Sequence, residues 1–207
     1  FRKINFTDKL PSFVSFHEYG TEYNEIPKID DNVKIFGYFG SEKYFKNYRN
    51  EILDLFEIDE KNKDELNEKY LDLINHPNSC SIHVRRGDYL NLQDYHKVQS
   101  IDYYINAYNE MGHDKKYLIF SDDLEWCKEN FDFIENKVII EGNTDYQDLY
   151  LMSLCKNNII CNSTFSWWGA WLNKNIDKKV IMPKNWFGVL YSHLSINDVI
   201  CNEWVVI

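Results

Sequence analysis

The chain has 207 residues, enough for one ordinary domain with part of a second, and its 44% hydrophobic content can fill a core. A formal net charge of −10 excludes broad binding to nucleic acid, which needs a basic face to neutralise phosphates. A local basic pocket for one small polyphosphate remains compatible with this charge. The sequence contains no apolar stretch as long as a transmembrane helix.

The first 78 residues predict few regular elements. Residues 1–32 are polar and irregular, with Pro11, Gly20 and Pro27 as breakers. Residues 33–40, VKIFGYFG, predict a short β-rich stretch, and residues 41–58 predict a helix with Ser41 as its N-cap. The highly charged residues 59–76 predict a surface helix whose charges form a solvated face.

From Ser79 onward, short strands and helices alternate. Strands are predicted in SCSIHV, KYLIFS, KVIIE, NNIICN and KVIMP, and helices in SIDYYINAYNEM, DDLEWCKENF, TDYQDLYLMSLC and STFSWWGAWLN. This alternation predicts a parallel sheet covered by helices, which is a Rossmann-like α/β fold. In such a sheet, ligands bind beyond the carboxyl ends of the strands.

Three clusters of polar residues follow predicted strands and should therefore meet at one edge of the sheet. The first contains His83, Arg85, Arg86 and Asp88, the second Asp122 and Asp123, and the third Asn162, Ser163, Thr164, Phe165 and Ser166. Adjacent guanidinium groups repel each other, and a polyanion between them offsets that repulsion with bidentate hydrogen bonds. The alternative is that one arginine simply pairs with Asp88.

The third cluster opens a helix, whose free backbone N–H groups and dipole favour an anion. The alternative of plain N-capping by Asn162 or Ser163 is compatible with phosphate binding. Asp122 and Asp123 are candidates to accept hydrogen bonds from guanine, and equally good candidates for the N-cap and first turn of the next helix. Trp167 is a candidate stacking residue or a core residue.

The cysteines and acids do not predict a metal site. The five cysteines are odd in number, have no CxxC spacing and lie mostly in apolar runs, which indicates buried free thiols in a reducing compartment. The chain has no D-x-D pair of the kind that usually holds the cation in metal-dependent nucleotide-sugar transferases. A metal-bound diphosphate is therefore not expected.

The residues resemble those of a known enzyme family. His83-Val84-Arg85-Arg86-Gly87-Asp88 is similar to the HxRRxD motif of α1,2-fucosyltransferases and their α1,6- and protein O-fucosyltransferase relatives. FSDDLEWCKENF, DYQDLYLMSLC, CNSTFSWWGAWLN and GYFGSEKYF resemble segments of the α1,2 branch, which is glycosyltransferase family 11, especially its bacterial members. The resemblance covers residues 33–183.

The resemblance implies a GT-B-type enzyme with a Rossmann-like donor domain, expected over residues 79–207, and an acceptor-side lobe, expected over residues 1–78. It implies inverting, metal-independent transfer of fucose from GDP-β-L-fucose to the 2-hydroxyl of a galactose-terminated glycan. Arg85 and Arg86 would hold the diphosphate, His83 with Asp122 or Asp123 would bind guanine, and residues 162–166 would line the phosphates and nucleoside.

The sequence departs from the family at two places. The strand and GLGNQ-like turn that open family members do not occur here, so the amino-terminal lobe is expected to be incomplete. Gly40 stands where the family often has glutamine, which bears on acceptor preference. The general base stays open among Asp88, Asp94 and His96, with Asp88 expected instead to orient Arg86.

Two further hypotheses stand beside galactoside α1,2-fucosyltransfer in O-antigen or capsule synthesis. One is a fucosyltransferase of another linkage, and the other is a GDP-binding fragment that does not turn over alone. The resemblance places the expected location in the bacterial cytoplasm. Peripheral contact with the inner membrane is expected of enzymes that serve lipid-linked glycans, although no basic amphipathic helix supports it here.

Overall fold

The computed structural model describes residues 14–28 and 33–207. The chain forms two compact units: Phe1–Glu57 with His193–Asn202, and Ile58–Ser192 with Glu203–Ile207. The boundary between the units falls after residue 57, so the helix predicted over 59–76 belongs with the sheet. The assignment of residues 1–78 and 79–207 to acceptor and donor lobes stays a prediction.

The first unit contains a small parallel sheet and short helical turns. Its strands β1 (Val14–His17) and β2 (Val33–Phe36) pair in parallel. The single helix predicted over 41–58 is wrong. Two 3₁₀ turns, η1 (Glu42–Tyr44) and η2 (Lys46–Tyr48), precede α1 (Arg49–Leu55), because Phe45 between them has non-helical φ and ψ of −142° and −4°. Ser41 does cap the first turn by accepting a hydrogen bond from the backbone of Lys43.

The second unit begins with α2 (Glu60–Ile74), which starts at an Asp59 N-cap. The predicted alternation after it is confirmed. The strands are β3 (Ser79–Val84), β4 (Lys116–Ser121), β5 (Lys137–Ile139), β6 (Asn157–Ile159), β7 (Val180–Met182) and β8 (Val205–Val206). The helices are α3 (Ile101–Met111), α4 (Leu124–Asn130), α5 (Asp145–Leu154) and α6 (Thr164–Leu172), with 3₁₀ turns η3 (Asp88–Asn91) and η4 (Val189–Tyr191).

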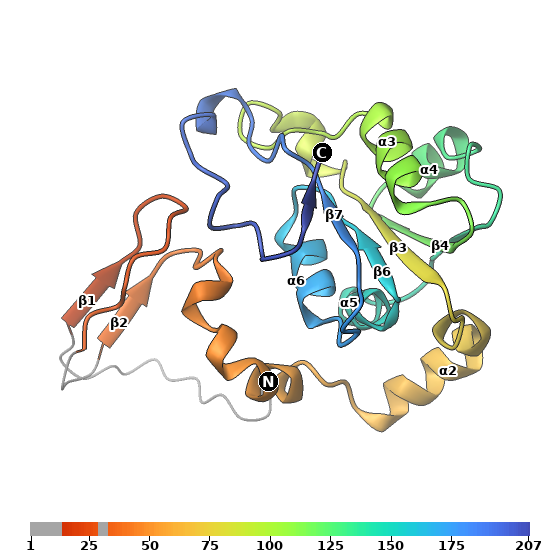
Figure 1. Ribbon diagram of the computed structural model, residues 1–207, viewed down its shortest axis with the longest axis horizontal. Coiled ribbons are helices and arrows are strands. Elements are labelled where there is room, and N and C mark those ends of the chain that lie inside the picture. Colours follow the sequence, from red (N-terminus) through yellow and green to blue (C-terminus); the bar gives the residue numbers. More distant parts are fainter. Residues whose placement is uncertain (1–13, 29–32) are drawn as a thin grey trace. The chain divides into compact units, whose positions relative to one another are not determined.

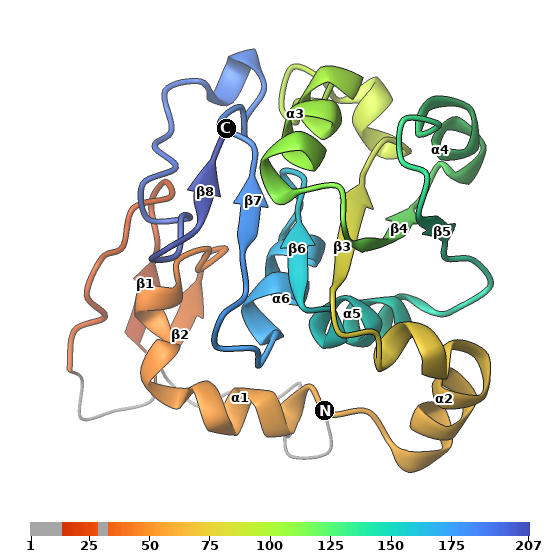
Figure 2. The same cartoon turned by 45° about the vertical axis from the view of Figure 1, so that its right-hand side comes forward.

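All six strands of this unit are parallel, in the order β5-β4-β3-β6-β7-β8 (Figure 2). Counted along the chain from β3, this is the order 3-2-1-4-5-6 of doubly wound dinucleotide-binding sheets. The direction of winding reverses between β3 and β6. Ligands of such sheets bind in the crevice beyond the carboxyl ends of the strands at this switch point.

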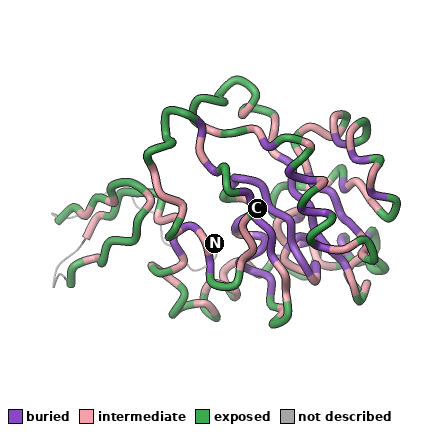
Figure 3. Tube along the Cα trace, turned by 45° about the horizontal axis from the view of Figure 1, so that its top comes forward, coloured by how far each residue is buried: buried purple, intermediate pink, exposed green. Residues whose placement is uncertain are grey.

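Helices cover both faces of the sheet (Figure 1). On one face, α3 and α4 pack against the apolar side chains Cys80, Ile82, Val84, Tyr117 and Ile119. On the other, α2 and α5 pack against Leu118 and Phe120. Every residue of β3 is buried, as expected for a central strand of a parallel sheet (Figure 3).

Several elements begin where the sequence indicates. Thr144 and Gln147 form a capping box at the start of α5, which satisfies two backbone donors there. All five cysteines are buried thiols that form no disulfide bond, as predicted. In the described part of the chain, no helix is long and apolar enough to cross a membrane.

Candidate functional site at the carboxyl edge of the sheet

The three predicted clusters come together because β4, β3 and β6 are neighbours in the sheet. The arginine loop follows β3, the aspartate pair follows β4, and α6 begins after β6. The arginine loop and the amino terminus of α6 therefore flank the switch point between β3 and β6. This convergence of distant segments was predicted from the alternation of elements, and the structure confirms it.

Arg85 is held by two carboxylates. Its Nε donates a hydrogen bond of 3.0 Å to Asp88 Oδ1, and its Nη1 lies 3.2 Å from Asp122 Oδ2. The expectation that Asp88 orients Arg86 is wrong. Asp88 opens the η3 turn three residues after Arg85, and this spacing brings its carboxylate to the Arg85 side chain. Asp88 thus pairs with Arg85, whereas Arg86 pairs with another carboxylate.

Arg86 is fixed along one edge and one face of its guanidinium group. Its Nε donates a hydrogen bond of 2.9 Å to Asp123 Oδ2, and its central carbon lies 4.1 Å from the centroid of the Trp126 ring. Within residues 14–28 and 33–207, the two terminal nitrogens of Arg86 make no hydrogen bond. The group is therefore pre-oriented, with two donors available to an anion.

Asp122 and Asp123 have different structural roles. The carboxylate of Asp122 accepts a 2.9 Å hydrogen bond from the backbone N–H of Arg86, besides its ion pair with Arg85. Asp123 is the N-cap of α4 and accepts a 3.2 Å hydrogen bond from the backbone of Trp126. The N-cap alternative is thus confirmed for Asp123, while guanine binding by either residue stays a prediction.

Gly87 lets the arginine loop approach the loop after β4. A Cβ at this position would lie 2.5 Å from Asp122 Oδ2 and 3.2 Å from Asp122 Cγ. A larger residue would push the loop away from the carboxylate that contacts both arginines. The glycine of the HVRRGD sequence is therefore required by the local packing.

His83 lies inside β3, is 4% exposed and faces α6. Its Nδ1 lies 3.2 Å from the Cys161 sulfur, and its ring packs against Phe165 with a centroid distance of 5.3 Å. Burial, and secondarily the charge of Arg85, lower the pKa of His83 to about 3. Burial raises the pKa of Cys161 to about 12. At neutral pH both groups are uncharged, and they form a polar contact beneath the arginine loop.

The amino terminus of α6 is capped by Ser163, whose hydroxyl accepts a 3.3 Å hydrogen bond from the backbone of Phe165. The Ser166 hydroxyl donates back to the carbonyl of Ser163 and is buried. Thr164 is exposed. Of the three hydroxyl groups predicted to line a ligand, only that of Thr164 therefore lies on the surface.

Asn162 joins three loops rather than facing open space. Its Oδ1 accepts a 2.9 Å hydrogen bond from Gln99, its Nδ2 donates a 2.8 Å bond to the Trp186 carbonyl, and its own carbonyl accepts a bond from the Tyr89 hydroxyl. Asn162 is thus placed to position the edge of the site. Trp167 is buried against other tryptophans and belongs to the core.

Sequence reasoning missed Tyr89, Gln99 and Trp126. Trp126 could have been found, because it follows the Asp123 N-cap by three residues on the first turn of α4. Tyr89 stacks on His96 with a centroid distance of 4.7 Å and lies beside Arg85. Gln99 carries no signal in the sequence, because its role depends on the spatial approach of Asn162. In the described residues, no three His, Cys, Asp or Glu side chains are grouped so as to hold a metal ion.

Comparison with known proteins identifies the family. The family model "Glycosyl transferase family 11" matches residues 9–207. The O-antigen biosynthesis glycosyltransferase WbnK of Escherichia coli is 36% identical over 172 residues, which cover 77% of this chain and 57% of that protein. The alpha-1,2-colitosyltransferase of Escherichia coli is 38% identical over 167 residues, 75% of this chain and 57% of that protein.

Two more distant similarities were found. The galactoside alpha-(1,2)-fucosyltransferase 2 of Hylobates lar is 27% identical, over 73% of this chain and 48% of that protein. Among solved structures, NodZ alpha-1,6-fucosyltransferase soaked with GDP-fucose aligns over 56% of this chain and 43% of that chain, at 14% identity and a TM-score of 0.41. The matched part of the chain thus spans about half the length of these curated relatives. Because the family model matches residues 9–207, nearly the whole chain, the chain belongs to glycosyl transferase family 11.

Proposed function

We propose that this chain carries the donor-binding part of an inverting, metal-independent galactoside α1,2-fucosyltransferase that uses GDP-β-L-fucose. The architecture proposed for the whole enzyme is GT-B, with residues 79–207 as the donor domain and residues 1–78 on the acceptor side. The proposed role is O-antigen or capsule synthesis in the bacterial cytoplasm; the similarity to WbnK, an O-antigen biosynthesis glycosyltransferase, supports the O-antigen part of this role.

One observation carries the proposal: two arginines and a helix amino terminus flank the switch point of a doubly wound sheet. Each feature by itself suits an anion, and the switch point is where sheets of this class bind nucleotides. A diphosphate that spans β3 and β6 would reach the two terminal nitrogens of Arg86 on one side. It would reach the first backbone N–H groups of α6 and the exposed Thr164 hydroxyl on the other.

The chemistry of the proposed reaction fits these groups. As the bond between fucose and GDP breaks, negative charge grows on the β-phosphate, and cations already in place lower the barrier. Arg86 is oriented before any ligand binds, because Asp123 and Trp126 hold it. Arg85 is paired with Asp88 and Asp122, so it would have to exchange a carboxylate for a phosphate. We therefore assign the larger share of diphosphate binding to Arg86.

The donor sugar is a second question. One relative at 38% identity is described as a colitosyltransferase, which favours GDP-colitose as an alternative donor. Transfer to another hydroxyl, and GDP binding without turnover, are the remaining alternatives. An assay that offers both donors identifies the sugar transferred, and the linkage of the product shows which hydroxyl received it. Together they separate the alternative donor and the alternative linkage from the proposed reaction.

The test is a calorimetric titration of the chain with GDP, with and without Mg²⁺. The expected result is binding that Mg²⁺ does not change and that weakens at least about tenfold in Arg86→Ala, a loss of about 1.4 kcal/mol. Lys128→Ala is the matched control, since it removes one positive charge from the exposed face of α4 and should leave binding unchanged. Mg²⁺-dependent binding, or equal binding by Arg86→Ala, would contradict the proposal.

A further inference from the structure

An exposed apolar surface lies on the same unit, beside the arginine loop. It is formed by the η3 turn with the residues that follow it and by the η4 turn, and its exposed apolar members are Leu90, Leu92, Tyr95, Val189, Leu190 and Tyr191. Contiguous exposed apolar surface of this kind commonly marks a binding site. Since nothing in the roles assigned above uses these side chains, the surface needs its own explanation.

The two turns are held together by backbone contacts. The Gly188 N–H donates a 2.8 Å hydrogen bond to the Tyr95 carbonyl, the Leu190 N–H donates a 2.8 Å bond to the Asp94 carbonyl, and His96 and Phe187 form an isolated antiparallel bridge. A Cβ on Gly188 would lie 2.3 Å from the Gln93 carbonyl oxygen. The surface is therefore a built structure and not two independent loops.

Aromatic contacts connect this surface with the arginine loop. The Arg85 guanidinium carbon lies 5.7 Å from the Tyr89 ring centroid, and Tyr89 stacks on His96. Tyr95 adjoins His96, and its ring meets Tyr191 edge-on with a centroid distance of 5.3 Å. Tyr95 is thus connected to Arg85 through His96 and Tyr89.

We propose that Tyr95 and Asp94 bind a pyranose ring of the glycan acceptor, an inference that rests on the proposed function. One face of a galactose ring is lined with C–H groups, which pack on the electron-rich face of an aromatic ring. Tyr95 is 40% exposed and its ring contacts Tyr191, so it offers an accessible and already ordered aromatic ring for such packing. Galactose hydroxyls need acceptors at the rim of the same ring.

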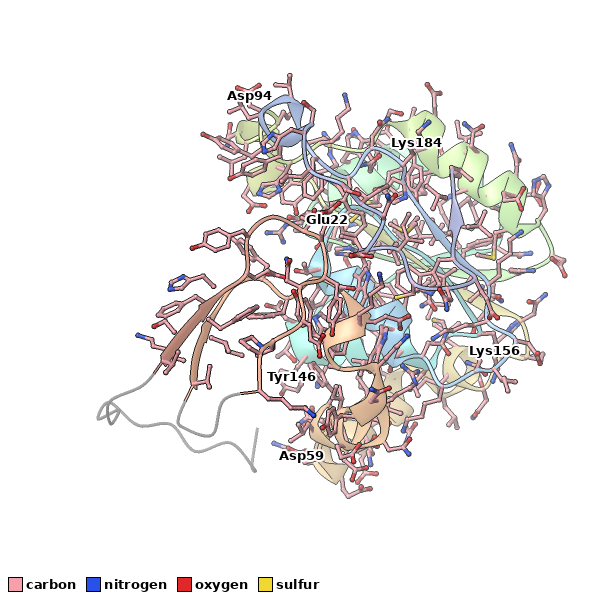
Figure 4. The ribbon with its side chains drawn as sticks, turned by 60° about the vertical axis from the view of Figure 1, so that its left-hand side comes forward. Glu22, Asp59, Asp94, Tyr146, Lys156 and Lys184 are labelled. Atoms are coloured by element: carbon pink, nitrogen blue, oxygen red, sulfur yellow. The ribbon has the colours of Figure 1, made fainter. Side chains whose placement is uncertain are left out.

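Asp94 supplies the acceptor. Its side chain is exposed and makes no hydrogen bond or ion pair within the described residues, whereas Asp88, Asp122 and Asp123 are all paired with arginine. Figure 4 shows Asp94 at the outer end of its loop. An apolar ring beside an unpaired carboxylate favours a sugar over a lipid surface, because the carboxylate and the net charge of −10 both oppose contact with an anionic membrane.

The test measures galactoside binding to the chain saturated with GDP, with methyl β-galactoside as the probe and saturation-transfer NMR as the readout. Tyr95→Leu is expected to weaken galactoside binding at least fivefold while the affinity for GDP is unchanged. Tyr95→Phe should retain binding because the ring remains, and Asp94→Asn should weaken it severalfold. Tyr146→Leu is the matched control, since this exposed tyrosine lies away from Asp94 in Figure 4.

The outcomes separate the two proposals. Absence of GDP binding by the unsubstituted chain contradicts the proposed function. GDP binding without galactoside binding, or equal galactoside binding by Tyr95→Leu, overturns the acceptor site alone. Loss of GDP binding in Tyr95→Leu also overturns it, because the tyrosine would then belong to the donor site. Self-association or vesicle binding that Tyr95→Leu abolishes would assign the surface to a second copy or to a membrane instead.

Discussion

The buried histidine of the central strand predicts how the stability of the second unit depends on pH. The pKa of His83 is about 3 in the folded chain, against an ordinary value of 6.5. Below pH 6.5 the unfolded chain takes up a proton at this residue and the folded chain does not. The stabilisation is therefore complete above pH 6.5 and is lost as the pH falls towards 3. Since pH 5.0 lies 1.5 pH units below the ordinary pKa of 6.5, the free energy of unfolding at pH 5.0 is lower by about 2 kcal/mol.

The measurement is urea unfolding at several pH values between 5.0 and 7.5, followed by tryptophan fluorescence. All six tryptophans lie within Ile58–Ser192 and Glu203–Ile207, so the signal reports this unit alone. The unsubstituted chain should lose about 2 kcal/mol of unfolding free energy between pH 7.5 and 5.0 that His83→Gln does not lose. The free energy of unfolding of His83→Gln, relative to that of the unsubstituted chain, should therefore rise by about 2 kcal/mol over this range. His113→Gln, which removes an exposed histidine from the same unit, is the matched control. A difference that stays constant over this range would refute the reasoning.

Three further predictions concern single substitutions. Gly87→Ala should destabilise the second unit by about 1–3 kcal/mol and weaken GDP binding, because the added Cβ would collide with the Asp122 side chain. Gly40→Ala is the control and should change neither property, because a Cβ there meets nothing within 4 Å. Unaltered GDP titrations of Gly87→Ala would contradict this prediction. Asp123→Asn keeps an N-cap for α4 but loses the charged anchor of Arg86, so calorimetry should show severalfold weaker GDP binding with a nearly unchanged melting temperature. Burial raises the pKa of Asp148 to about 6, so its ionised form opposes folding. Asp148→Asn should therefore raise the urea midpoint clearly more at pH 7.5 than at pH 4.5, and a gain of equal size at both would exclude this cause.

The sheet of the second unit was predictable because its signals are local. Each strand is a short apolar run, and each helix begins at a residue that suits an N-cap, such as Thr144 before α5. The convergence of Arg85, Asp122 and Ser163 followed from the alternation alone, since parallel strands share a carboxyl edge. Local pattern therefore predicted both the fold class and the edge that carries the candidate site.

The pairing of individual side chains was not predictable in the same way. Asp88 was expected at Arg86 and contacts Arg85, because the conformation of the η3 turn decides which guanidinium it reaches. The strand β1 was missed because its four alternating residues, VSFH, lie in a polar stretch with few other strand signals, and it pairs with a strand 19 residues further on. Gln99 and Asn162 are 63 residues apart, and only the completed sheet brings them together. Contacts of this kind depend on tertiary structure rather than on propensity.

The route of the chain after β7 affects how the protein can be made. After β7 the polypeptide continues in the second unit to Ser192, contributes His193–Asn202 to the other unit, and returns to add β8 to the sheet. Until residues 203–207 have left the ribosome, the buried strand β7 presents an open edge of unpaired backbone groups, the kind of edge on which chains aggregate. Translation of residues 203–207 therefore ends a window in which a holdase chaperone, or slower expression at low temperature, should increase the soluble yield.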